Sequence, residues 1–210
     1  SAASDVYKRQ LPRNAAGIPT GLTCKGIVFH IIDDFETFKS TNDLNDSNLN
    51  GYQEKHGLVV STKKGNNFGT VAAADIEQAF IDGNVEKYTD TETSNGYKLT
   101  QILVGTENLG FIALNNHTEK LNNSTAWYAP SFNELKYLIQ GENTQTGSTS
   151  GQEYINKQLK KINADELAGT IPSVTFYNGV GDHGLRLMTG GSENGWHGIP
   201  GEAFYPICAF

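Results

Sequence analysis

The sequence lacks the features that would place it in a membrane or on nucleic acid. Its 210 residues contain no apolar run that approaches the roughly 20 residues a helix needs to cross a bilayer, so we expect no membrane insertion in this segment. Its 16 basic residues are outnumbered by 23 acidic ones, and the net charge of -7 would repel a phosphate backbone. We therefore expect no nucleic-acid partner.

Motifs of catalysis and metal binding are missing as well. The chain contains no nucleophile elbow, no Cys-x-x-Cys or His-Glu-x-x-His motif and no phosphate-binding loop. Asp182 and His183 are adjacent, but the glycines on either side of them favour an exposed turn over an acid-base pair. The polar segment 41–51 lacks the spaced acidic positions and the terminal glutamate of an EF-hand. We predict no enzyme, no cofactor and no metal site.

Cysteine is scarce, because Cys24 near the start and Cys208 near the end are the only two. If the first and last strands are neighbours in a sheet, a disulfide could join these cysteines and stabilise the fold by about 2 to 4 kcal/mol. Two buried free thiols are the alternative. Two cysteines are too few to establish an oxidising compartment, so both interpretations stay open at this point.

The first ten residues show neither hydrophobic periodicity nor turn signals. We interpret residues 1–23 as a disordered or non-native leader and predict a single domain over residues 24–210. The start lacks the apolar centre of a signal peptide, so we expect an export signal to lie upstream of this segment. Only 19% of the residues are charged and 23 are glycine, a composition typical of a loop-rich extracellular or cell-surface module.

The first half of the chain predicts a hairpin followed by helices. Residues 24–32 and 56–61 are rich in β-branched and aromatic side chains and predict two paired strands. Residues 72–80 have weak helical spacing and predict a short surface helix. Apolar residues across 95–116 predict a helix that is interrupted or kinked around Gly105.

The second half predicts two better-defined helices and then strands. Ser131 and Glu134 have the spacing of a capping box, which predicts a helix over residues 131–140 that ends before Gly141. Residues 152–167 predict a further amphipathic helix. Three short strands are expected at 174–177, 185–188 and 203–210, with irregular glycine-rich loops between them. This order predicts an α+β fold, with helices gathered around an antiparallel sheet.

Several short segments resemble bacterial surface domains of the DUF1566 and major-paralogous-domain type. The segments are Gly-Ile-Val-Phe at 26–29, His-Gly-Leu-Val-Val at 56–60, Trp-Tyr-Ala-Pro-Ser at 127–131 with Glu-Leu at 134–135, and Tyr-Pro-Ile-Cys-Ala-Phe at 205–210. The resemblance implies a C-type-lectin-like fold with adjacent N- and C-terminal strands and two to three helices. The chain departs from the family at 175–179, where a Tyr-Trp-Ser-Ser-Thr-Glu-like strand is usual. It also lacks the lectin calcium signatures, so calcium-dependent sugar binding is not carried over.

A narrower resemblance is to the variable proteins of diversity-generating retroelements, which carry changeable residues near the C-terminus of a lectin-like fold. The corresponding window here is residues 177–199, where polar and aromatic residues stand among glycines. The candidate ligand-binding residues are Tyr177, Asn178, Asp182, His183, Arg186, Asn194, Trp196 and His197. The resemblance implies a bacterial or phage recognition domain that uses C-terminal loops to bind a protein or glycan on another cell or particle. The alternative is a structural tip or stalk domain of a pilus, a surface lipoprotein or a phage fibre.

Overall fold

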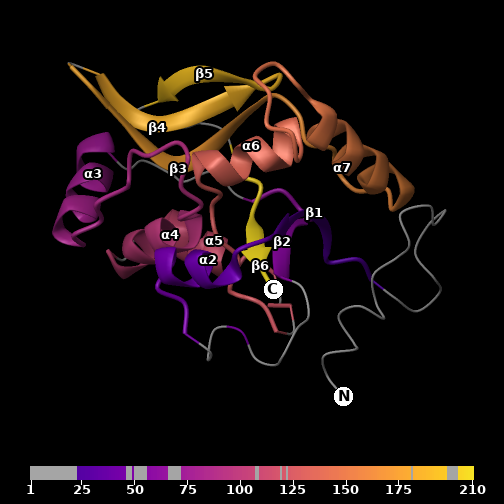
Figure 1. Cartoon of the computed structure of the whole chain (residues 1–210), viewed down its shortest axis with the longest axis horizontal. Coiled ribbons are helices and arrows are strands. Elements are labelled where there is room, and N and C mark those ends of the chain that lie inside the picture. The colour runs from indigo at the N-terminus through magenta and orange to yellow at the C-terminus, as the bar shows by residue number, and fades with distance from the viewer. Residues whose placement is uncertain are drawn as a thin grey trace.

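The computed structural model describes most of the chain. The described residues are 23–45, 49, 56–65, 72–106, 109–118, 120–121, 123–180, 182–197 and 203–210. The leader predicted over residues 1–23 lies outside the described residues except for Thr23, and so does much of the polar segment 41–51. The described part is a mixed α+β fold with two small antiparallel sheets (Figure 1).

The first sheet, called sheet A here, joins both ends of the described chain. Its strands are β1 (Gly26–Ile32), β2 (His56–Ser61) and β6 (Ile207–Ala209), in the order β1-β2-β6. The predicted hairpin is confirmed, because β1 and β2 pair antiparallel. The predicted adjacency of the first and last strands is wrong, because Val59 of β2 pairs with Val28 on one side and with Cys208 on the other. Strand β2 thus takes the centre of the sheet, where both of its edges are paired and every residue after His56 is buried.

The second sheet, called sheet B here, contains the C-terminal window. Its strands are β3 (Thr170–Gly179), β4 (Asp182–Thr189) and β5 (Ser192–His197), paired in sequence order. The sequence predicted a loop where β5 lies. Gly190 and Gly191 have φ angles of 56° and 79°, and they link Thr189 to its pairing partner Ser192. Positive φ at both central residues is the signature of a tight hairpin turn, so this glycine pair continues the sheet instead of ending it.

Helices cover one side of sheet B and fill the space between the sheets. They are α2 (Phe35–Thr41), α3 (Ala73–Asp82), α4 (Gly96–Gly105), α5 (Leu109–Asn115), α6 (Phe132–Gln140) and α7 (Ser150–Lys161). The described residues thus form six helices, not the two to three that the lectin-like resemblance implied, and α2 was not predicted. The predicted interruption at Gly105 separates α4 from α5. No helix built from described residues has the length and apolar character needed to span a membrane.

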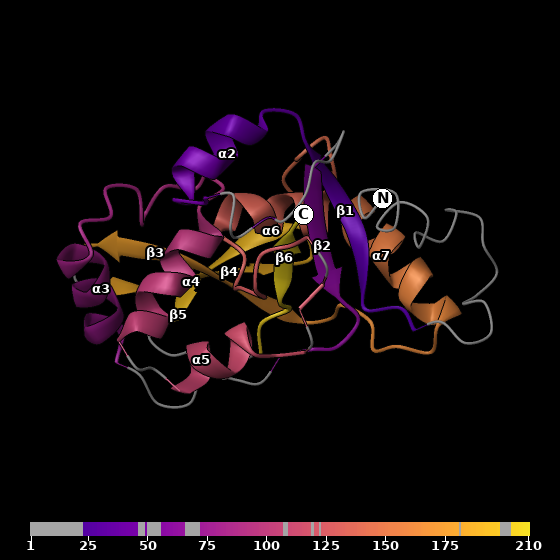
Figure 2. The same ribbon diagram turned by 90° about the horizontal axis from the view of Figure 1, so that it is seen from below.

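The hydrophobic core has two large parts that meet near α6. One part joins α6 and α7 to the inner face of sheet A and includes Leu135, Ile155 and Val60. The other joins α3, α4 and α5 to sheet B and includes Phe80 and Phe176. Figures 1 and 2 show α6 between the two sheets, with α3, α4 and α5 at one end of the molecule and α7 at the other. The hydrophobic stripe of α6 lies in the first part of the core, where it packs with Val60 of sheet A and with Ile171 and Met188 of sheet B.

The start of α6 confirms the predicted capping box. Ser131 Oγ accepts a hydrogen bond from the Glu134 amide at 3.4 Å, and Glu134 Oε2 accepts one from the Ser131 amide at 2.7 Å. Tyr128 Oη donates to Glu134 Oε1 at 3.1 Å. The Glu134 side chain is fully buried, and this burial raises the pKa of its carboxyl group to about 7 although the hydrogen bonds favour the ionised form. The helix ends as predicted at Gly141, whose φ is 89°.

The buried carboxyl group of Glu134 predicts a stability that falls as pH rises. Its pKa of about 7 lies above the ordinary value of 4.5, so the folded state binds more protons than the unfolded state between these pH values. The free energy of unfolding should therefore decrease from about pH 4.5 to about pH 7 and level off above that, with Glu134 contributing roughly 3 kcal/mol to the change. Urea unfolding of Glu134→Gln should show a flatter pH dependence than wild type. The exposed Glu86→Gln control should keep the wild-type slope, and equal slopes in all three proteins would contradict the assignment.

Two glycines of the same helix should respond oppositely to substitution by alanine. A methyl group on Gly96 would lie 2.6 Å from the carbonyl oxygen of Ala129 and would strike the Glu134 carboxylate, whereas one on Gly105 has nothing within 4 Å. We expect Gly96→Ala to destabilise the fold by about 2 kcal/mol or more, through overpacking and the loss of a buried hydrogen bond. Gly105→Ala should be neutral or stabilise by up to about 1 kcal/mol. Thermal melts of the two variants measure this difference. Equal changes in melting temperature would show that the space around Gly96 can accept a methyl group.

Candidate functional site on the β3–β4 hairpin

The C-terminal window is mostly strand and not the set of irregular loops that the sequence predicted. Tyr177 pairs with Gly184, Asn178 with His183 and Gly179 with Asp182, so the two strands stay in register up to the turn. Val180 lies at this turn and is fully exposed. Figures 1 and 2 show the end of the hairpin beside α3, at the same end of the molecule.

On one face of the hairpin, Arg186 is held between two aromatic rings. Its guanidinium carbon lies 5.0 Å from the centroid of the Tyr177 ring and 5.9 Å from that of Phe132 at the start of α6. Its Nη1 donates to the carboxylate of Glu193 on β5. The Arg186 side chain is only 16% exposed, so the cation–π contacts and the ion pair act in a partly desolvated setting. These contacts hold the Tyr177 ring and the Arg186 side chain together on one face of the hairpin.

Gly179 allows the Tyr177 ring to lie close to the backbone. A methyl group at position 179 would lie 2.6 Å from Cε1 of Tyr177 and 2.7 Å from its hydroxyl oxygen. Any larger residue there would have to displace the ring. Glycine at this position therefore leaves room for the Tyr177 ring in the place where it lies.

On the opposite face, the hairpin is tied to α3 and the segment after it. The His183 ring stacks on the Phe176 ring with centroids 6.4 Å apart, and the Asn178 amide donates to the Glu77 carboxylate of α3. The same carboxylate accepts from Tyr88 Oη at 3.4 Å, and the Phe176 amide donates to the Tyr88 carbonyl oxygen at 2.8 Å. Both faces of the hairpin are therefore supported by neighbouring elements.

The structure divides the predicted site residues between the two faces. Tyr177 and Arg186 lie on one face, and Asn178 and His183 lie on the other, as the alternation of a strand requires. Asn194 is exposed on β5. The side chains of Asp182, Trp196 and His197 lie outside the described residues, although the backbones of the last two pair with Arg186 and Leu185.

Four residues with a role at this site were not among the predicted ones. They are Glu77, Phe132, Val180 and Glu193. The Gly-Gly turn was the sequence signal that would have placed Glu193 near Arg186, because it sets the register of β4 and β5. Glu77 and Phe132 come from helices distant in the chain, and local sequence patterns contain no signal for such contacts.

This arrangement supports recognition by hydrogen bonding and aromatic contact. The exposed part of the hairpin offers an amide, an imidazole and a branched apolar side chain, with a phenol ring beside them. Within the described part of the chain, no group of three or more histidine, cysteine, aspartate or glutamate side chains is placed to hold a metal ion. Comparison of the chain with protein-family models, curated proteins and solved structures gives no match.

The two cysteines are free thiols, so the disulfide considered from the sequence is absent. Strand β2 lies between β1 and β6, and two strand spacings separate backbones by about 10 Å, beyond the reach of a disulfide. Cys208 is 1% exposed, and burial raises the pKa of its thiol to about 12. Cys24 is only partly buried, and burial raises the pKa of its thiol as well.

The two thiols should differ in their reaction with an alkylating reagent. Iodoacetamide should modify Cys24 slowly in the native protein, because this thiol is partly accessible, and should leave Cys208 unmodified. Both should react after unfolding in guanidinium chloride without a reductant. Peptide mass spectrometry identifies the modified cysteine. A native protein 2 Da lighter than the reduced form, with no reactive thiol after unfolding, would reveal the disulfide and contradict the structure.

Proposed function

We propose that this chain is a non-catalytic recognition domain of the extracellular or cell-surface type, which binds a protein or glycan through the β3–β4 hairpin. The observation that carries the proposal is the exposed Val180 at the end of a hairpin whose two faces are both anchored. Tyr177, Asn178 and His183 stand beside it on the paired strands. Aromatic and hydrogen-bonding side chains gathered at one exposed edge are the groups that adaptable contact surfaces use.

The anchoring of the hairpin favours binding because it lowers the entropy lost on association. A flexible loop must be ordered when a ligand binds, whereas a hairpin already held by Glu77 and Arg186 loses less freedom. Tyr177 is suited to this role because its side chain has few rotatable bonds and its ring packs against the Arg186 guanidinium. The ligand then meets a preformed surface.

The proposed fold family is the C-type-lectin-like one of DUF1566-type domains. The α+β class supports it, as does the presence of the first and last strands in one sheet. The segment 127–131 also supports it, because Tyr128 pairs with Ile207 of β6 and Ser131 caps α6. In the narrower proposal of a retroelement variable protein, the changeable residues would lie on β3, β4 and β5 and at their turns.

The alternative of a structural tip or stalk domain would require a continuous apolar surface for packing against neighbours. The large hydrophobic residues exposed in the described part of the chain are Ile31, Ile81 and Val180. Ile31 lies on β1 in sheet A, whereas Ile81 lies on α3 and Val180 at the hairpin turn, so the three do not share one packing surface. This distribution favours recognition by the hairpin over assembly.

Substitutions on the hairpin should reduce ligand capture without unfolding the domain. We expect Tyr177→Ala and His183→Ala together to weaken binding to a printed glycan array or to intact bacterial cells by about tenfold or more, the range of a central interface residue. The control is Ile31→Thr, an exposed apolar residue of sheet A, which should leave binding unchanged. Far-ultraviolet circular dichroism and thermal melts confirm that each variant is folded.

Two outcomes of this experiment would reject the hairpin as the site. One is unchanged capture by a folded hairpin variant. The other is an equal loss of capture in the Ile31→Thr control, which would place the contact on sheet A. Concentration-dependent self-association that Ile31→Thr abolishes would favour the structural alternative.

A further inference from the structure

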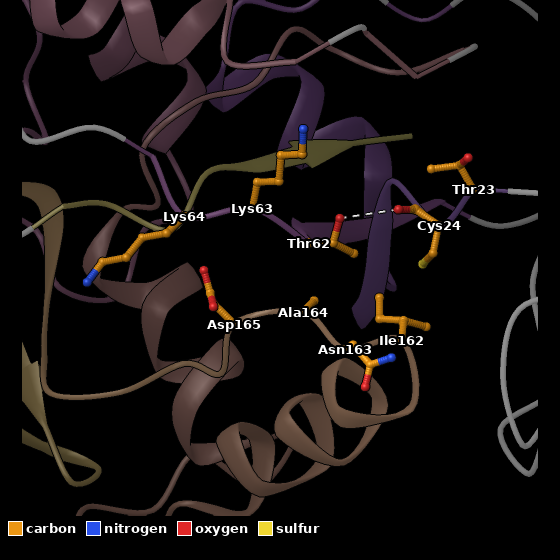
Figure 3. A pocket seen from close by; sticks show the side chains of 9 residues that line it. All are labelled: Thr23, Cys24, Thr62, Lys63, Lys64, Ile162, Asn163, Ala164 and Asp165. Carbon is orange, nitrogen blue, oxygen red and sulfur yellow. Dashed lines mark hydrogen bonds between the residues drawn. The ribbon is translucent and has the colours of Figure 1, made fainter.

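A pocket of about 530 Å³ lies at the end of the molecule opposite the hairpin (Figures 1 and 3). It is lined by residues 23–24, 62–64 and 162–165, where the start of β1 and the end of β2 face the segment after α7. Figure 3 shows that the ammonium groups of Lys63 and Lys64 both point away from the hollow. Its cations therefore do not converge on one ligand position, and we assign no ligand to it.

Sheet B has two outer strands, and they differ in regularity. The outer strand β5 has a bulge, because the register shifts between Arg186 and Met188 of β4 and Gly195 on β5 has a φ of 81°. A bulge of this kind interrupts the backbone spacing that a further strand needs. On the other side, β3 pairs with β4 without interruption from Phe176 to Gly179. The hairpin end of β3 is therefore the regular edge of sheet B.

The outer edge of β3 already receives two carbonyl groups from other parts of the chain. The Val174 amide donates to the Pro130 carbonyl oxygen at 2.8 Å, and the Phe176 amide donates to the Tyr88 carbonyl oxygen at 2.8 Å. Pro130 precedes α6 and Tyr88 follows α3, so the two acceptors come from unrelated segments. This edge of the strand thus binds backbone carbonyl groups at every second residue.

Asn178 repeats the geometry of Phe176 two residues further along the strand. In an antiparallel pair, residues alternate between those whose backbone groups bond the partner strand and those whose backbone groups point away from it. Because the Phe176 amide points outward and the pairing continues without a shift, the N–H and C=O groups of Asn178 point outward as well. The described part of the chain gives neither group a partner, and Asn178 is exposed. Both groups are therefore available to a partner molecule.

The end of β3 is held in place on both faces, so these backbone groups have a fixed position. The Asn178 side-chain amide donates to the Glu77 carboxylate of α3, and the Arg186 guanidinium packs on the Tyr177 ring on the other face. An exposed and rigid strand edge binds extended peptides by adding them to the sheet as a further strand. Main-chain hydrogen bonds then supply affinity, and side chains on alternate faces supply selectivity.

We propose that the β3 edge at Asn178 binds an extended segment of a partner protein as an added strand. The proposal rests on the proposed function and deepens it, since it makes the ligand of the hairpin a peptide backbone and not a glycan. A carbonyl oxygen of the partner accepts from the Asn178 amide, next in line after the Tyr88 carbonyl oxygen, and an amide of the partner donates to the Asn178 carbonyl oxygen. Side chains of the added strand point alternately to the face of Tyr177 and to the face of His183.

Proline and alanine at position 178 separate the backbone group from the side chain. Asn178→Ala removes the bond to Glu77 but keeps the backbone N–H, whereas Asn178→Pro removes both. An edge strand tolerates proline where the nitrogen faces away from its neighbour, and Tyr177 before it is already extended. The probe is the linear peptide that a phage-displayed library of random ten-residue peptides yields against wild type. Asn178→Pro should bind this peptide about tenfold more weakly than Asn178→Ala.

Two measurements on wild type remain decisive if the proline variant fails to fold. Methylation of single backbone nitrogens of the peptide should weaken binding by about tenfold at alternate positions only, because every second amide of an added strand faces β3. Hydrogen exchange of the Asn178 amide should slow in the complex, whereas exchange of the exposed Glu86 amide after α3 should not.

Several results would overturn the strand pairing. They are the absence of any enriched peptide, equal affinity of folded Asn178→Pro and Asn178→Ala, unchanged exchange of the Asn178 amide in the complex, and capture of a glycan by the hairpin. Concentration-dependent dimerisation that Asn178→Pro abolishes would assign the edge to a second copy of this chain instead.

Failure of the strand pairing is distinguishable from failure of the proposed function. If the Tyr177→Ala and His183→Ala double variant loses capture while the two variants of Asn178 bind equally, the hairpin remains the site and only the strand pairing is wrong. If the folded double variant keeps full capture, the hairpin itself is excluded.

Discussion

The buried side chain of Glu134 connects sheet A, α4 and α6, and the rest of the fold depends on this connection. It accepts hydrogen bonds from the Ser131 amide and from the Tyr128 hydroxyl, and Gly96 at the start of α4 lies directly against it. Tyr128 in turn pairs with Ile207 of β6. Sheet A and two helices therefore meet at one group that has no access to water. Burying a charged group is unfavourable unless it is satisfied, so the position of each donor is strongly constrained.

The same segment also fixes sheet B and so the candidate site. The Val174 amide donates to the Pro130 carbonyl oxygen at 2.8 Å, and the Phe132 amide donates to Thr175 Oγ1 at 2.7 Å. These two bonds hold β3 against the start of α6. The Phe132 ring contacts the Arg186 guanidinium, which in turn contacts the Tyr177 ring. The position of the helix cap therefore determines where Arg186 and Tyr177 lie. The hairpin is thus stabilised by a residue network whose centre is in the core.

Sequence reasoning succeeded where local chemistry decides the structure. The capping box at Ser131 and Glu134 and the β1–β2 hairpin were both predicted, because they depend on residues close in the chain or on a strong apolar pattern. Helix α2 was missed because it has only seven residues, and its Asp34 cap resembled the end of a strand. The place of β6 beside β2 could not be read from the chain, because strand order depends on tertiary packing. The disulfide hypothesis rested on that order and is wrong for the same reason.

The residues of the candidate site stay a prediction from the sequence, and their geometry could not be predicted. Successive side chains of a strand point to opposite faces. The assignment of β3 as a strand is therefore enough to place Tyr177 and Asn178 on opposite faces. The pocket lined by residues 23–24, 62–64 and 162–165 was not predicted, because its three segments are brought together only by the fold.

Amide hydrogen exchange is the measurement that tests the central role of the segment 127–134 most directly. The account predicts that the amides of Val174 and Phe132 exchange only through global unfolding, with the same free energy as the Leu135 amide inside α6. Exchange of the Val174 amide through a separate opening of much lower free energy, while Leu135 stays protected, would contradict the account, because sheet B would then be held independently of the helix cap.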